Sequence, residues 1–61
     1  MRTFSCLITD DRYAIPTLAF FLAADERRAR ELALSRLMDS QHHREVEVLE
    51  NGRAIYNWAR D

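Results

Sequence analysis

Apolar and polar residues alternate with a period of two in two stretches of the chain, residues 3–9 and 44–50, and residues 53–58 are expected to form the strand that returns beside the second stretch. This period is typical of strands that bury one face, because successive side chains of a strand point to opposite sides of the sheet. The apolar side of the first stretch consists of Phe4, Cys6 and Ile8. Each stretch is therefore expected to form a half-buried strand.

An uncharged, largely apolar segment covers residues 15–23. It is too short to span a membrane, which takes about 20 residues as a helix. Pro16 would interrupt a helix, and because proline has no backbone N–H it fits the start of a strand or a strand at a sheet edge. We therefore expect a second strand, at an edge, joined to the first by a turn at residues 10–12, where Asp side chains favour turn conformations.

Residues 25–39 have the pattern of one amphipathic helix. Asp25 is suited to cap its N-terminus, and Glu26 adds negative charge to the first turn. At 100° per residue, the apolar stripe consists of Ala29, Leu32, Ala33 and Leu37. Such a helix is expected to bury one face against the sheet.

Asn51 and Gly52 form the strongest hairpin signal in the chain, since both residues accept a positive φ. A two-residue loop there predicts an antiparallel pair of strands. The expected partners are Glu50 with Arg53, Leu49 with Ala54, Val48 with Ile55, Glu47 with Tyr56 and Glu45 with Trp58.

The order of elements is β-β-α-β-β, without repeats, and predicts a single α+β domain over residues 1–61. If the helix returns the chain across the sheet, the third strand can pair antiparallel with the first. With the second strand at an edge, the four-stranded antiparallel sheet has the expected order 2-1-3-4, with the helix packed on one face.

The face that the helix cannot cover is predicted to be unusually apolar. The helix side is expected to bear Phe4, Cys6, Ile8, Leu18, Phe20, Val46, Val48 and Ile55. The other side is expected to bear Leu7, Ile15, Ala19, Phe21, Leu49, Tyr56 and Trp58. Because large exposed apolar patches usually mark interaction surfaces, we expect this side to pack against a second copy, as a homodimer, or against another protein. The expected interface residues are Leu7, Phe21, Leu49, Tyr56 and Trp58.

Binding of single-stranded nucleic acid is the alternative function. Phe21, Tyr56 and Trp58 on an open sheet face could stack on unpaired bases, with nearby Arg side chains contacting phosphates. The formal net charge of −1 counts against this alternative, as do Glu45 and Glu47, which are expected beside the rings.

The charge of the chain indicates which kinds of partner it is not suited to bind. All nine basic residues are Arg and ten residues are acidic, mixed along the chain, so no net field favours a polyanion or an anionic membrane. This composition is typical of a GC-rich bacterial genome.

Cys6 is the single cysteine, which excludes an internal disulfide and favours a small buried apolar residue over a reactive thiol. The first residues lead directly into the first strand, without the apolar stretch of a signal peptide, and the expected location is the cytoplasm.

No group of residues predicts catalysis, a cofactor, a metal or a small-molecule ligand. His42 and His43 are adjacent, and no second pair stands at ligand spacing. Asp10 and Asp11 are explained by turn formation, and the Glu residues of 45–50 by the polar side of a strand. With Gly52 as the single glycine, a glycine-rich phosphate loop is excluded.

Three segments, residues 13–18, 24–33 and 46–53, resemble small bacterial proteins of β-β-α-β-β layout that have no assigned function. The resemblance covers the whole chain and implies the fold and a bacterial origin. The hairpin and helix of the first half are also similar in layout to antitoxin domains of the HicB kind. The acidic, glycine-containing strand pattern of those domains and a DNA-binding segment are missing here.

Overall fold

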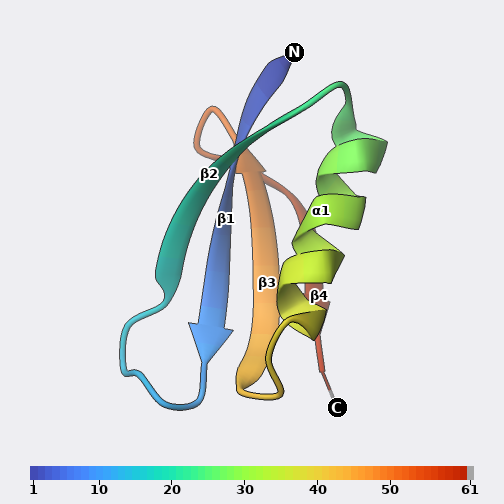
Figure 1. Ribbon diagram of the computed structural model, residues 1–61. Coiled ribbons are helices and arrows are strands. Elements are labelled where there is room, and N and C mark those ends of the chain that lie inside the picture. Colours follow the sequence, from blue (N-terminus) through green and yellow to red (C-terminus); the bar gives the residue numbers. More distant parts are fainter. Residues whose placement is uncertain (61) are drawn as a thin grey trace.

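The computed structural model describes residues 1–60 and contains four strands and one helix (Figure 1). They are β1 (Arg2–Asp10), β2 (Thr17–Ala23), α1 (Glu26–Met38), β3 (His43–Glu50) and β4 (Arg53–Ala59). The strands form one antiparallel sheet of order β2-β1-β3-β4. The predicted α+β fold, its β-β-α-β-β order and its strand order 2-1-3-4 are confirmed.

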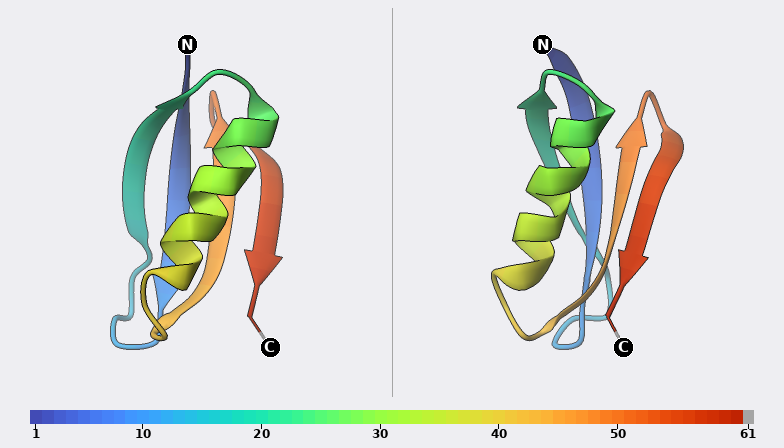
Figure 2. Two further views of the ribbon diagram at one scale, coloured as in Figure 1. Left: turned by 45° about the vertical axis from the view of Figure 1, so that its right-hand side comes forward. Right: turned by 90° about the vertical axis from the view of Figure 1, so that its right-hand side faces the viewer.

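The helix begins and ends close to the predicted residues. Asp25 is the N-cap, and its side chain accepts a hydrogen bond from the backbone N–H of Arg28 at 2.9 Å. Asp39 is the C-cap. Helix α1 lies on one side of the sheet, where it packs mainly over β3, as the two views of Figure 2 show. It is too short and too polar to cross a membrane, and the described residues contain no other helix.

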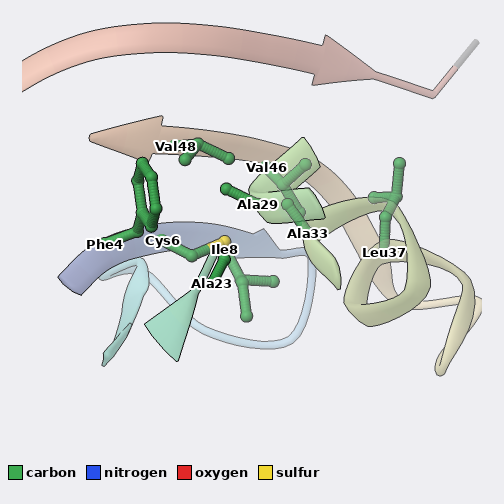
Figure 3. Packing of buried hydrophobic residues seen from close by; sticks show 9 residues of the cluster. All are labelled: Phe4, Cys6, Ile8, Ala23, Ala29, Ala33, Leu37, Val46 and Val48. Carbon is green, nitrogen blue, oxygen red and sulfur yellow. The ribbon is translucent and has the colours of Figure 1, made fainter. Parts of the chain in front are cut away.

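A small apolar core lies between α1 and the sheet (Figure 3). Its residues are Phe4, Cys6, Ile8, Ala23, Ala29, Ala33, Leu37, Val46 and Val48. The two helical alanines are fully buried, and their small side chains let the helix backbone approach the strands closely. Most of the predicted helix stripe and of the predicted β1 face is thus buried.

The hairpin between β3 and β4 has the predicted turn, with φ of 54° at Asn51 and 78° at Gly52. The register beyond it differs from the prediction, because a β-bulge follows the Leu49–Ala54 pair. Val48 pairs with Tyr56, and not with Ile55 as expected. One extra residue on a bulged strand shifts all later pairs by one position. The predicted partners of Val48, Glu47 and Glu45 are therefore wrong by one residue.

The predicted faces of β2 are also wrong. Phe21 pairs with Phe4, and their rings stack on the helix side with centroids 5.9 Å apart. Leu18 and Phe20 therefore point away from the helix, where they are 52 % and 70 % exposed. A shift of one residue moves every side chain of a strand to the other face. Strand β2 has apolar residues at both its even- and its odd-numbered positions. The alternation of polar and apolar residues alone therefore does not decide which set is buried.

Candidate interaction surface

The sheet face opposite α1 is solvent-exposed, and we call it the open face. The register of the strands places side chains from all four strands on it. They are Thr3, Ser5, Leu7 and Thr9 of β1, Leu18, Phe20 and Leu22 of β2, Glu45, Glu47 and Leu49 of β3, and Ala54, Asn57 and Ala59 of β4.

One half of the open face is apolar. Leu18, Phe20 and Leu22 form a stripe along β2 and are all more than half exposed. Leu7 lies beside Leu18 in the register, and Leu49 lies across β1 from Phe20. We call these five residues the apolar half. Two of the five predicted interface residues, Leu7 and Leu49, belong to it.

The other half of the open face is acidic and belongs to β3 and β4. Glu45 accepts a hydrogen bond from the Asn57 side chain at 2.6 Å, and Glu47 pairs with Asn57 in the register. Both carboxylates border a shallow depression of about 200 Å³. The open face is therefore divided into an apolar half along β2 and an acidic half along β3 and β4.

Phe21, Tyr56 and Trp58, the other predicted interface residues, lie on the helix side of the sheet. Phe21 and Tyr56 pack against the core, and the Arg30 guanidinium lies 5.5 Å above the Tyr56 ring. Trp58 pairs with Val46, a core residue, and remains 47 % exposed at the sheet edge. The bulge at Ile55 changed the faces of Tyr56 and Trp58, and the register of β2 changed that of Phe21.

The exposed residues of β2, Leu18, Phe20 and Leu22, are not among the five predicted interface residues. A signal for them exists in the size of the alternate residues, because Ala19 and Ala23 leave room for a helix above the sheet. Large side chains at those positions would hold the helix away. The pattern of small residues within an otherwise apolar strand therefore indicates which side of β2 faces α1.

A cluster of charged residues around Asp10 lies at the end of β1 and stabilises the turn that follows this strand. Asp10 is only 4 % exposed. It accepts hydrogen bonds from the backbone N–H and the guanidinium of Arg12, at distances between 2.7 and 3.0 Å. Nε2 of His43 lies 3.7 Å from the same carboxylate. The hydrogen bonds from Arg12 hold the pKa of the Asp10 carboxyl well below its usual range.

Asp10 is expected to make the stability of the fold depend on acid pH. Because its pKa is lowered by folding, its contribution is complete above the unfolded pKa of about 4 and is lost as the pH falls below that value. The melting temperature of the wild type should fall as the pH is lowered from neutral to about 3. Asp10→Asn should melt lower at neutral pH and show a shallower fall. Asp39→Asn, at the exposed helix end, is the control for the removal of one negative charge. An unchanged slope in Asp10→Asn would contradict the role of Asp10.

The other residues that could carry chemistry are the cysteine and the two histidines, and they are held in contacts within the fold. Cys6 is a buried core residue, and burial raises the pKa of its thiol. Among residues 1–60, no three side chains of His, Cys, Asp or Glu gather in a way that could hold a metal ion. Nδ1 of His42 lies 3.0 Å from Asp11, and Nδ1 of His43 lies 2.7 Å from the Arg36 carbonyl oxygen. The partner of His42 therefore lies in the connection between β1 and β2, and the partner of His43 lies in the last turn of α1.

The chain matches no protein-family model, no curated protein and no solved structure. The resemblance to small bacterial proteins and to HicB-like domains stays a prediction from the sequence pattern. A functional proposal for this chain rests on its own surfaces, of which the open face is the most distinctive.

Proposed function

We propose that this chain is a small self-associating interaction module whose contact surface is the apolar half of the open face. The observation that carries the proposal is the stripe of Leu18, Phe20 and Leu22, exposed to 52 %, 70 % and 58 % on one side of an edge strand. Side chains of this kind are normally buried. A contiguous exposed group of them is typical of a protein interaction site.

The size of the patch is sufficient for association. Tyr13 and Ile15, which precede β2 in the chain, are also exposed, to 62 % and 78 %. With about 150–250 Å² for an aromatic side chain and somewhat less for an aliphatic one, the stripe and these two residues together offer on the order of 600 Å² per copy. Specific interfaces bury about 600–1,000 Å² per partner. The patch therefore reaches the lower end of the range for a specific interface.

Self-association would also add stability to a domain of only 61 residues. A chain this short buries only about 60 % of the surface that it exposes when unfolded, and its single core gives marginal stability. Contact between two copies would remove further apolar surface from water, at about 25 cal/mol per Å² before the costs of association. The homodimer would thus be more stable than the separate domain.

The nucleic-acid alternative has less support from these surfaces. Its proposed stacking rings, Phe21, Tyr56 and Trp58, lie on the helix side, where Phe21 is engaged with Phe4. On the open face, Phe20 is the single aromatic residue of the four strands, and the carboxylates of Glu45 and Glu47 lie on the same face. Carboxylates repel a phosphate backbone, which dominates the affinity of such complexes.

Replacement of Phe20 by serine tests the proposed function. Sedimentation equilibrium from low to high micromolar concentration should show association of the wild type, and Phe20→Ser should weaken it by about tenfold or more, equivalent to about 1.4 kcal/mol. Trp58→Ala, a partly exposed aromatic residue on the opposite side of the sheet, is the control and should associate like the wild type. A wild type that stays monomeric over the whole range would contradict the proposal, as would equal association of Phe20→Ser.

A further inference from the structure

The two edges of the sheet differ in how they are protected. Edge strands expose unpaired backbone groups, and proteins block them with charges, bulges or prolines. Edge strand β4 has the bulge, with Arg53 at its start and Arg60 directly after its end. Edge strand β2 is flanked by Pro16, but no charged residue occurs from Tyr13 to Ala24. Strand β2 is therefore the edge that remains open to another strand.

We propose that two copies of the chain pair antiparallel through their β2 edges, so that two four-stranded sheets become one sheet of eight strands. This inference rests on the proposed function and specifies how the self-association occurs. The occupant of the β2 edge is a second copy of this chain, related to the first by a two-fold axis. Backbone hydrogen bonds between the two β2 edges provide most of the contact. The stripes of the two copies meet side by side as cross-strand apolar pairs, and their outer surface stays on the open face of the joined sheet.

The register of the pairing follows from the length and the sequence of β2. Strand β2 runs from Thr17 to Ala23, so the two-fold register that uses all seven residues is centred on Phe20. It places Phe20 opposite Phe20 of the second copy, and Leu18 opposite Leu22. Directly opposite residues of an antiparallel pair lie on the same face, and all of these are on the open face. Every residue of the stripe then lies opposite an apolar residue of the second copy.

Side chains on the helix side leave room for this pairing. Between the two copies, that side would carry Thr17, Ala19, Phe21 and Ala23, of which Phe21 is the single large residue and already packs against the core. Helix α1 lies mainly over β3, away from the β2 edge (Figure 2). The helices of the two copies are therefore separated by both β2 strands.

Charge favours pairing at the edge over stacking of two whole open faces. If the faces stack with β2 over β2, Glu45 and Glu47 of one copy meet the same residues of the other. If they stack with β2 over β4, β3 lies over β1, and these carboxylates are buried against Leu7 and the hydroxyl residues of β1 without a cationic partner. Either contact is costly, because buried charges need partners. In the edge-paired sheet, the two β3 strands lie five strand spacings, or about 24 Å, apart, and salt screens charges beyond about 8 Å.

Two cysteine variants that keep Phe20 test the register. Under mild oxidation by air, Leu18→Cys mixed with Leu22→Cys should give a disulfide-linked heterodimer, because these positions lie opposite each other. Each variant alone places its two cysteines four residues out of register, about 13 Å apart, which exceeds the limit of about 7 Å between Cα atoms in a disulfide. The mixture should therefore cross-link about tenfold more than either variant alone. The wild type, with buried Cys6 as its single thiol, is the blank.

The outcomes separate this inference from the proposed function. Preferential cross-linking of the mixture, with wild-type circular dichroism for both variants, supports the edge pairing. Association in sedimentation without preferential cross-linking overturns the edge pairing and leaves self-association through the apolar half in place. A wild type that is monomeric at all concentrations overturns both.

Discussion

Phe4→Ala is expected to cause the largest loss of stability of any variant considered, about 3–5 kcal/mol in the free energy of unfolding. Phe4 is 1 % exposed and stacks on Phe21 at a centroid distance of 5.9 Å, between β1 and β2 under the helix. Truncating a buried phenylalanine to alanine costs about 3–5 kcal/mol, from lost apolar contact and from the cavity that remains. At about 0.05–0.15 kcal/mol per residue, a domain of this length has a total stability of only roughly 3–9 kcal/mol.

Phe20→Ala is the matched control for Phe4→Ala, because it makes the same chemical change on the other side of the sheet. Phe20 is 70 % exposed, so its truncation should change the free energy of unfolding of the monomer by about 0.5 kcal/mol or less. Urea unfolding followed by circular dichroism measures both variants, at a concentration low enough for the wild type to be monomeric. Equal losses in the two variants would contradict the assignment of the two sheet faces.

Leu37→Ala is expected to have the second largest effect on stability. Leu37 is fully buried in the last turn of α1 and belongs to the core with Val46 and Val48 (Figure 3). Alanine there should cost about 2–5 kcal/mol. Ala29 and Ala33, the other buried residues of α1, already have short side chains, so Leu37 provides the deepest apolar contact between the helix and the sheet. Its loss should free the C-terminal part of α1 first.

Met38→Ala is the control for Leu37→Ala, one residue further along the same helix. Met38 is 62 % exposed and has the Nη2 atom of Arg60 3.9 Å from its sulfur. The change should cost about 0.5 kcal/mol or less. The midpoints of thermal unfolding measure both. If Met38→Ala were the more damaging of the two, the helix would have to pack on the sheet through a different face.

Where residues have different polarity on the two sides of an element, the sequence predicted the structure well. The helix has alanine and leucine on one side and charged residues on the other, so its bounds and its buried face were predicted closely. Strand β1 has Phe4, Cys6 and Ile8 at one parity and mostly hydroxyl residues at the other, and this face was also predicted correctly. The Asn51–Gly52 turn was predictable because few residues accept a positive φ.

The predicted sheet faces were wrong where the local pattern of polar and apolar residues fits either assignment of the side chains to the two faces. Strand β2 has apolar residues at both its even- and its odd-numbered positions, so polarity alone assigns neither Phe20 nor Phe21 to the core. Strand β4 has a bulge at Ile55, and a bulge is visible only in the pairing with β3. Three of the five predicted interface residues were placed on the wrong face for these two reasons.

By itself, the sequence determined the elements, their order, the sheet topology and the existence of one uncovered sheet face. Only the tertiary structure decided which side chains occupy that face. The physical reason is the space on the helix side: Ala23 of β2 fits into the core there and Phe21 stacks on Phe4, and Leu18, Phe20 and Leu22 are left on the other side. The exposed stripe on which the proposed self-association rests is thus a consequence of how closely one helix packs on the sheet.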